Sequence, residues 1–345
     1  MNGPNSRSTS YAVASLVDGY LEWMAVRQYS EDHRGARRKE LRHFSEYAAE
    51  RNVTRIHDVS RAFVERYQRH LFYYRKKNGK PLGPTTQYQR ICSVKMFLKW
   101  AARQHIIDVN PAADIDMPRL PMKLPREVLT PREAELVLIQ PDVKELLGVR
   151  DRAMLEVLYS TGMRRKELAN LLIHDVNQER GTVMVREGKG KRDRVVPIGN
   201  RALEWIEKYI TETRGHLVVE PDSKFLFLST TGEAFHPDYL TRMVRQYILQ
   251  ADVGKKGSCH IFRHTMATAM LENGADIRFI QAILGHAKPE TTSIYTRVSI
   301  TKLKEIHTAT HPAGRPIEEK PVQPGEGTAA ELLEDLAEEA ISDEG

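Results

Sequence analysis

The stretch GTVMVREGKGKRDRVVPIG, residues 181–199, decides the fold class because it interrupts a chain that otherwise reads as helices. Its β-branched residues gather in two clusters, 182–187 and 194–198, and a turn rich in glycine and lysine separates them. Two such clusters joined by a glycine-containing turn are typical of an antiparallel hairpin. We therefore expect a mainly α chain with a small β-hairpin sheet (α+β), with Lys189 at the hairpin tip.

Four further motifs flank the hairpin, one before it and three after it. TGMR occupies residues 161–164, HIFRH 260–264, LGH 284–286 and TTSIYTRV 291–298. With the GKG of residues 188–190 they supply six candidate catalytic side chains: Arg164, Lys189, His260, Arg263, His286 and Tyr295. His260 and Arg263 are three residues apart, so on a helix they share one face.

These side chains suit an attack on a phosphodiester. Arginine forks stabilise the negative charge that develops on the phosphate oxygens, and a general acid protonates the departing oxygen. A tyrosine that stays bound to the phosphate conserves the ester, so rejoining needs no ATP. We expect no cofactor and no metal: His260 and His264 have the spacing of a zinc helix, but the glutamate of a metalloprotease helix is missing.

In their order and spacing the motifs resemble the tyrosine recombinase (phage integrase) family, and most closely its Xer-like site-specific recombinases. The family pattern runs TG-L/M-R, a hairpin lysine in GKG, HxxR, LGH and TxxYT/S, with nine residues from the last histidine to the tyrosine. All of these are present between residues 128 and 300, and Tyr295 stands nine residues after His286. The N-terminal half resembles the family's helical core-binding domain more loosely.

The resemblance implies a role for each motif residue. Tyr295 would be the nucleophile that forms a 3′-phosphotyrosyl bond, and Lys189 the general acid toward the 5′ oxygen. Arg164 and Arg263 would clamp the scissile phosphate, and His260 and His286 would hydrogen-bond it or move protons. Glu167 would orient a neighbouring arginine or histidine, with a plain surface glutamate as the alternative.

The resemblance also implies a fold, an activity and partners. Two domains would hold double-stranded DNA in a C-shaped clamp, and a homotetramer on paired sites would exchange strands through a Holliday junction, with or without a related recombinase or accessory protein. The segment 299–309 has apolar residues at helical spacing, and in this family such a helix docks into the neighbouring protomer. A type IB topoisomerase-like relaxing enzyme and a non-catalytic DNA-binding regulator are the alternatives.

The rest of the chain divides by composition. We expect a helical DNA-binding domain over 1–110, with helices near 11–28, 36–51, 61–74 and 85–104, and a proline-rich linker over 111–127. The catalytic domain would cover 128–310, with a capped helix at Thr130 and a further short strand at 225–228. Candidate DNA-reading side chains on the second and fourth helices are Arg37, Arg38, Arg42, Gln87, Arg90 and Lys95.

Charge is distributed unevenly along the chain. The formal net charge is +6, but residues 317–345 alone carry −9, so the preceding residues carry +15. A body this basic predicts a polyanionic partner such as nucleic acid. For the acidic tail, 311–345, with its possible short helix over 329–341, two interpretations are open: it restrains DNA binding, or it only keeps the protein in solution.

Cysteine content and the N-terminus bear on the compartment. The two cysteines, Cys92 and Cys259, are far apart, which favours neither a disulfide framework nor a metal cluster. The polar N-terminus, MNGPNSRSTS, lacks the apolar core of a signal peptide, and no run of residues is apolar enough for a membrane span. We expect a soluble, cytoplasmic, nucleoid-associated protein.

Overall fold

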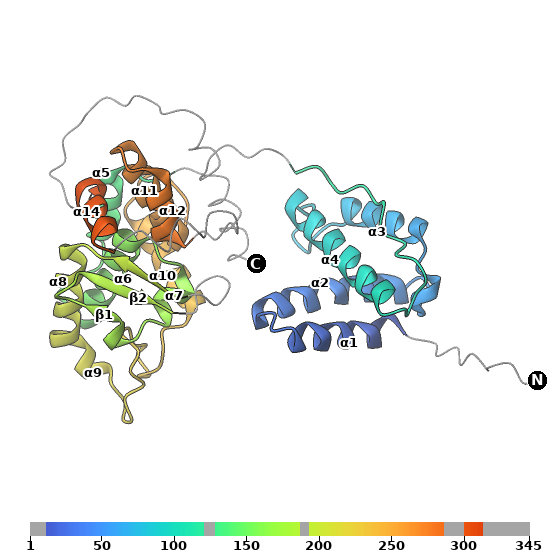
Figure 1. The fold of residues 1–345 in the computed structure, drawn as a ribbon, viewed down its shortest axis with the longest axis horizontal. Helices are drawn as coiled ribbons and strands as arrows, with labels where there is room; N and C mark the ends of the chain where they lie inside the picture. Colours follow the sequence, from blue (N-terminus) through green and yellow to red (C-terminus); the bar gives the residue numbers. More distant parts are fainter. Residues whose placement is uncertain (1–11, 121–127, 187–192, 286–299, 313–345) are drawn as a thin grey trace, which may run out of the picture. The chain divides into compact units, whose positions relative to one another are not determined.

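The chain forms two compact units, Met1–Leu124 and Pro125–Glu344. The computed structural model describes residues 12–120, 128–186, 193–285 and 300–312 (Figure 1). The described part is mainly helical with one small antiparallel sheet, which confirms the predicted fold class. Within the same part, no helix is both long enough and apolar enough to cross a membrane.

The first unit is built on four helices, α1 (Val13–Val26), α2 (Glu31–Ala49), α3 (Arg61–Tyr73) and α4 (Pro84–Arg103). α3 begins as expected, because the Ser60 side chain accepts a hydrogen bond from the amide of Phe63. α2 begins five residues earlier than expected, because Ser30 caps it in the same way. Aromatic rings of α2 and α3 pack in the core, where the ring centroids of Phe44 and Tyr67 are 5.1 Å apart.

The second unit contains the sheet and the remaining helices. The helices longer than one turn are α5 (Pro131–Leu138), α6 (Leu146–Thr161), α7 (Arg165–Ala169), α8 (Asn200–Tyr209), α10 (Pro237–Gln250), α11 (Cys259–Glu272), α12 (Ile277–Leu284) and α14 (Ile300–Thr310). α5 has the predicted capping box, in which Thr130 and Glu133 accept each other's backbone amides. A five-residue π-helical segment, Ile210–Arg214, and the short α9, Gly215–Leu217, continue α8.

The sheet has three strands in the order β1-β2-β3, with β1 at Val176–Asn177, β2 at Thr182–Val185 and β3 at Arg194–Pro197. β2 and β3 are antiparallel with Val185 opposite Arg194, which confirms the predicted hairpin. The strand expected at 225–228 is wrong. Phe225 and Leu228 each make one isolated bridge, to Leu172 and Ala234, so this segment follows the core without joining a ladder.

α6 is the central helix of the second unit, and every residue from Gly148 to Thr161 is buried. Its buried charges are paired with nearby groups, as burial requires. Arg152 donates to Glu156 at 2.7 Å and 3.0 Å, and Arg201 from α8 donates to the other oxygen of the same carboxylate at 2.9 Å. A helix held on all sides in this way gives a fixed starting point for the TGMR motif at its C-terminal end.

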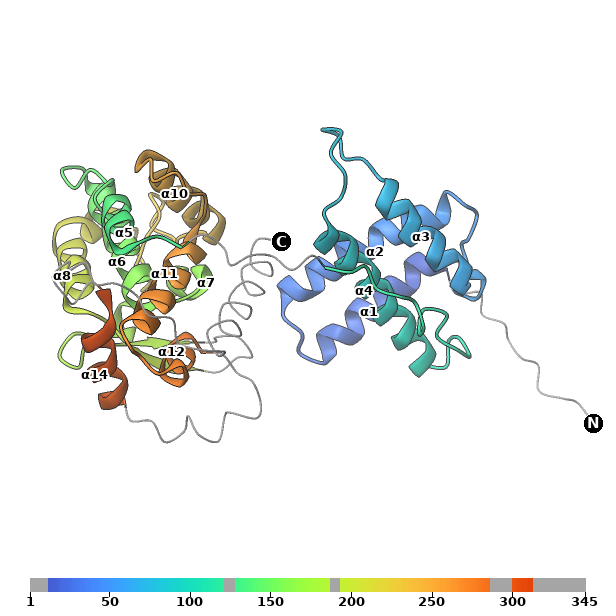
Figure 2. The ribbon, with the colours of Figure 1, turned by 90° about the horizontal axis from the view of Figure 1, so that it is seen from above.

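α14 packs on its own unit, beside α11 in both views (Figure 1, Figure 2). Two buried histidines attach it to the end of α6. The Nε2 of His307 lies 2.6 Å from the carbonyl oxygen of Ser160, and that of His311 lies 2.9 Å from the carbonyl oxygen of Tyr159. Since a carbonyl only accepts, both Nε2 atoms carry the proton, and the two rings stack 4.7 Å apart. In the single chain this helix is therefore anchored on its own unit, and its docking on a neighbour stays a prediction.

We expect acid to destabilise the second unit through these two histidines. Burial lowers the pKa of both, and the charge of His307 lowers that of His311 further. In the unfolded chain each would return to about 6.5, so the unfolded state binds more protons below that pH. Stability is therefore complete above about pH 6.5 and falls as the pH drops, by at most about 1.4 kcal/mol per pH unit for each histidine.

Urea unfolding between pH 7.5 and 5.5, followed by pulsed hydrogen exchange of α6, measures this slope. The variant His307→Gln, His311→Gln keeps an N–H donor at both positions but does not titrate there, so its slope should be shallower. An unchanged slope would show that the pH dependence arises elsewhere.

Candidate active site

The TGMR motif forms a tight turn between α6 and α7. Gly162 ends α6 with φ 59° and ψ 21°, a left-handed conformation that glycine adopts without strain. A side chain there would also collide, because a Cβ atom would lie 2.3 Å from the terminal methyl of Met266 and 3.0 Å from a methyl of Leu284. The turn brings Arg164 to the start of α7 at a fixed position against α11 and α12.

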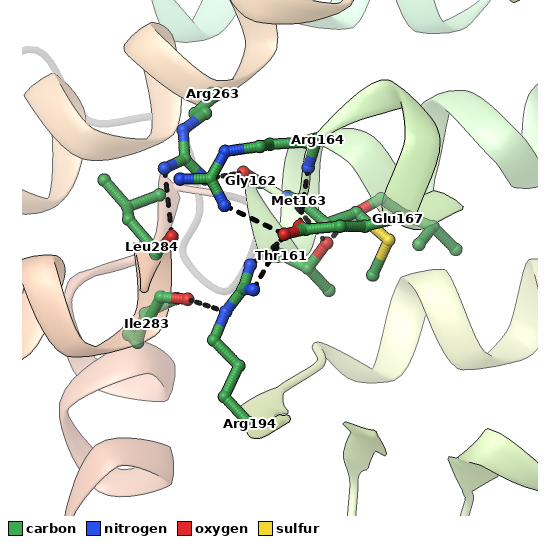
Figure 3. A network of polar contacts seen from close by, with 10 residues as sticks. Thr161, Gly162, Met163, Arg164, Glu167, Arg194, Arg263, Ile283 and Leu284 are labelled. Carbon is green, nitrogen blue, oxygen red and sulfur yellow. Dashed lines mark hydrogen bonds and ion pairs between the residues drawn. The ribbon is translucent and has the colours of Figure 1, made fainter. Parts of the chain in front are cut away.

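Arg263 from α11 holds the same turn from the other side. Its side chain is 1% exposed, and it donates to the carbonyl oxygen of Gly162 at 2.7 Å and to that of Leu284 at 3.0 Å. These carbonyls end α6 and α12, where the helix dipole favours a cation. Figure 3 shows Arg164 and Arg263 at this turn. The two arginines predicted from TGMR and HIFRH therefore meet, although they are far apart in the sequence.

Glu167 is the anion of the cluster, and it is buried in it. Its Oε1 accepts from the guanidinium of Arg164 at 2.9 Å, and its Oε2 accepts from the backbone amide of Arg164 at 2.9 Å. Burial alone would raise the pKa of Glu167, but the hydrogen bonds and charge of Arg194, together with Arg164, lower it to about 2. The surface alternative for Glu167 is wrong, because the residue is only 8% exposed.

Arg194, the first residue of β3, completes the cluster, and sequence reasoning missed it. Its two outer nitrogens donate to the two oxygens of Glu167, both at 2.8 Å, and its Nε donates to the carbonyl oxygen of Ile283 at 3.2 Å. A signal was available, since Arg194 and Val196 share one face of the strand and Val196 is fully buried. A charged side chain on the same strand face as a buried residue needs a partner of opposite charge.

His260 lies one turn before Arg263 on α11 and is 5% exposed. It lines a hollow of about 740 Å³, together with Ile248, Leu249 and the cations Arg245 and Lys256. α11 thus brings together the histidine and the arginine of HIFRH, as the three-residue spacing predicted. His264, the residue weighed as a zinc ligand, lines the same hollow.

Arg165, the neighbour of Arg164, is directed to a different helix. It donates to the carboxylate of Asp238 at 3.0 Å and to the hydroxyl of Thr241 at 3.1 Å, and both residues belong to α10. Arg164 is therefore the arginine of the pair that contacts Glu167.

Lys189, His286 and Tyr295 lie outside the described residues. Their described neighbours nevertheless border the cluster. Arg194 follows the segment of Lys189, and Gly285, whose φ is 71°, directly precedes His286. α14 begins five residues after Tyr295.

The six candidate DNA-reading side chains of the first unit differ in what they contact. Arg38 and Arg42 are exposed, with carboxylates of their own helix 3.9 Å and 3.7 Å away. Arg37 bonds Ser93 and so ties α2 to α4, while Gln87 donates to the carbonyl of Leu82 at 2.9 Å. Lys95 donates to the carbonyls of Ala113 and Ile115, and the guanidinium of Arg90 lies 6.0 Å from the ring of Tyr74.

Each of the two units matches the model of a known protein family. The phage integrase family matches residues 127–302, and the phage integrase SAM-like domain matches residues 15–117. Tyrosine recombinase XerC 2 of Ralstonia nicotianae is 46% identical over 315 residues, which cover 90% of each chain. Tyrosine recombinase XerD of Staphylococcus epidermidis is 32% identical over 299 residues, which cover 86% of this chain and 99% of the relative.

Solved structures have the same fold. The XerH site-specific recombinase bound to palindromic difH substrate, in a post-cleavage complex, has a TM-score of 0.62 at 22% identity and covers 86% of this chain and 84% of its own. A lambda integrase tetramer bound to a Holliday junction has a TM-score of 0.61 at 17% identity, covering 84% and 78%. With both domain matches and the close relatives, the chain belongs to the phage integrase family, among its Xer-like tyrosine recombinases.

Proposed function

We propose that this chain is a site-specific DNA recombinase that cleaves and rejoins DNA strands by transesterification at tyrosine. Membership of the family supports this activity. The single observation that carries it in the structure is the meeting of Arg164 and Arg263 at one turn, each oriented by hydrogen bonds inside a buried cluster. Phosphoryl transfer without a metal or cofactor requires fixed positive groups that stabilise the charge on the phosphate oxygens, and two oriented guanidinium groups can supply this stabilisation.

The motif residues account for each bond that forms or breaks in this reaction and for the proton of the leaving group. The hydroxyl oxygen of Tyr295 attacks the scissile phosphorus, a phosphorus–oxygen bond forms, and the bond to the 5′ oxygen breaks. Lys189 gives the proton that turns the departing oxygen into a 5′-hydroxyl. A 5′-hydroxyl from the exchanged strand then attacks the 3′-phosphotyrosyl ester and releases the tyrosine, so the number of ester bonds is unchanged and no ATP is consumed.

The described residues have separate tasks in this scheme. Arg164 and Arg263 bind the non-bridging oxygens, where a fork geometry gives two hydrogen bonds for one charge. Glu167 holds Arg164 in place. His260, from the same face of α11 as Arg263, and His286 hydrogen-bond the phosphate or accept the proton of the tyrosine.

For the domains, we propose that residues 1–110 bind DNA, 111–127 link the domains, 128–310 catalyse the reaction, and 311–345 form an acidic tail. Arg38 and Arg42 are the best placed of the candidate readers, because their side chains are exposed and, in the described part of the chain, their ion pairs are with carboxylates of the same helix. The partner is double-stranded DNA with paired sites, and the active assembly is a homotetramer. The similar lambda integrase tetramer on a Holliday junction supports this stoichiometry.

Replacing the nucleophile is the first test. A nicked DNA substrate, made from a site that the purified chain selects in a randomised pool, should trap a covalent protein–DNA adduct on a denaturing gel. Tyr295→Phe should abolish the adduct and leave DNA affinity unchanged, because it removes only the attacking oxygen. An adduct formed by Tyr295→Phe would identify another nucleophile. Relaxation of supercoiled DNA without recombination between two sites would favour the topoisomerase alternative.

Changing Arg263 tests the clamp. Arg263→Lys keeps one positive charge but does not reach the carbonyls of Gly162 and Leu284 together while binding phosphate. Adduct formation should slow by about a hundredfold or more, with DNA affinity within a few-fold of the parent. Arg201→Lys is a matched control, because Arg201 also bonds a buried carboxylate, that of Glu156, but lies outside the cluster. Equal losses in both variants would mean that Arg263 acts only through stability.

Removing the tail tests the restraining interpretation of its negative charge. If residues 313–345 compete with DNA for the basic body, a chain ending at Pro312 should bind DNA more tightly than the full chain. The difference should shrink as salt is raised, because salt screens the competition between the two polyanions. Identical binding and cleavage by both chains would leave the solubilising interpretation.

A further inference from the structure

We propose that Arg194 is a positioning residue of this active site, which neutralises Glu167 so that the positive charge of Arg164 remains directed at the phosphate. The inference rests on the proposed function and extends it to a residue outside the recognised motifs. Four observations carry it: the shared carboxylate oxygens, the charge balance of the cluster, the depth of burial and the way Arg194 itself is held.

The hydrogen bonds show that the two arginines share one carboxylate. Oε1 of Glu167 accepts from Nη1 of Arg164 at 2.9 Å and from Nη1 of Arg194 at 2.8 Å. Oε2 accepts from the backbone amide of Arg164 at 2.9 Å and from Nη2 of Arg194 at 2.8 Å. Arg194 therefore forms the bidentate pair, while the side chain of Arg164 makes a single bond to this carboxylate (Figure 3).

The charges decide what this geometry means. Within this set of three side chains, two guanidinium groups and one carboxylate sum to one net positive charge, and Arg194 takes the bidentate share of the carboxylate. The side chains of Arg194 and Glu167 are 13% and 6% exposed, so water screens the pair weakly. Without Arg194, the buried carboxylate would have Arg164 as its remaining arginine. Arg164 would then form the bidentate pair itself, and the net charge of Arg164 and Glu167 together would be zero.

Arg194 is itself held rigidly. Its Nε donates to the carbonyl of Ile283 at the end of α12, and its stem lies flat against Gly285. A Cβ atom at Gly285 would lie 2.9 Å from both Cδ and Nε of Arg194, so glycine in LGH leaves the space that this side chain fills. A side chain fixed at both ends supplies an oriented charge rather than a mobile surface cation.

The first experiment compares two substrates. Arg194→Met keeps most of the side-chain length and removes the charge, and we expect it to slow covalent adduct formation by roughly a hundredfold on the selected site. A methylphosphonate at the scissile position lacks the negative charge of the phosphate and leaves an arginine less charge to stabilise, so on that substrate the loss caused by the variant should be smaller than on the phosphate, within about a few-fold of the parent. An equal loss on both substrates would overturn the inference.

The second experiment removes the opposite charge. If Arg194 acts by neutralising Glu167, then the double variant Arg194→Met, Glu167→Gln should recover adduct formation relative to Arg194→Met, because no carboxylate is left to capture Arg164. A purely structural salt bridge predicts a double variant at least as slow as the single one, and that result would overturn the inference. Arg201→Met is the control: it removes a half-buried arginine from the buried carboxylate of Glu156, outside the cluster, and should show neither substrate dependence nor rescue by Glu167→Gln.

A crystal structure of Arg194→Met without DNA judges the inference apart from the proposed function. Both outer nitrogens of Arg164 should then contact Glu167, and the double variant should reverse this. An Arg164 that keeps its single carboxylate bond in Arg194→Met would overturn the inference. Failure of the proposed function would be seen in a different experiment, because the parent protein itself would then form no covalent adduct on any selected DNA.

Discussion

The carboxylate of Glu167 is the interaction on which the rest of the second unit's polar structure depends. It accepts four hydrogen bonds, two at each oxygen, from Arg164 and Arg194. These hydrogen bonds fix the first turn of α7 and the start of β3. Through Arg194 they also fix the end of α12. An ion this deeply buried is destabilising unless it is well hydrogen-bonded, and here each oxygen of Glu167 accepts two bonds.

Helix ends supply the second half of the same electrostatic arrangement. α6 and α12 both finish at a glycine with a left-handed backbone, Gly162 and Gly285, and the carbonyls at those ends accept from Arg263 and Arg194. The negative ends of two helices and one carboxylate thus hold cations together before any phosphate is present. The repulsion among the arginines is offset during folding, so under the proposed mechanism DNA would meet a site that needs little reorganisation.

Much of this was predictable because local rules determine it. The hairpin over 182–198, the capping box at Thr130 and the start of α3 at Ser60 follow from turn and capping chemistry, and the structure confirms them. The meeting of Arg164 and Arg263 was expected from the resemblance of the motifs to a known family, and no local rule determines it. The contacts of Arg194 could not be predicted in the same way, because they depend on which face of the strand is buried. The contacts of Lys95 depend on the backbone carbonyls of a later loop, to which its amino group donates. The segment 225–228 has the composition of a strand, but among the described residues it makes only isolated bridges, to Leu172 and Ala234.

The attachment of α14 to its own unit has a consequence for assembly. A helix tethered beside its binding surface is present there at an effective concentration of about a millimolar or more. The α14 helix of a second copy, free in solution at micromolar concentration, competes poorly for the same surface. In separate chains α14 therefore stays bound to its own unit. Two copies bound to adjacent sites on one duplex reach comparable local concentrations. An exchange of α14 between copies would then be governed by the spacing of the DNA sites rather than by the affinity of the protein surfaces.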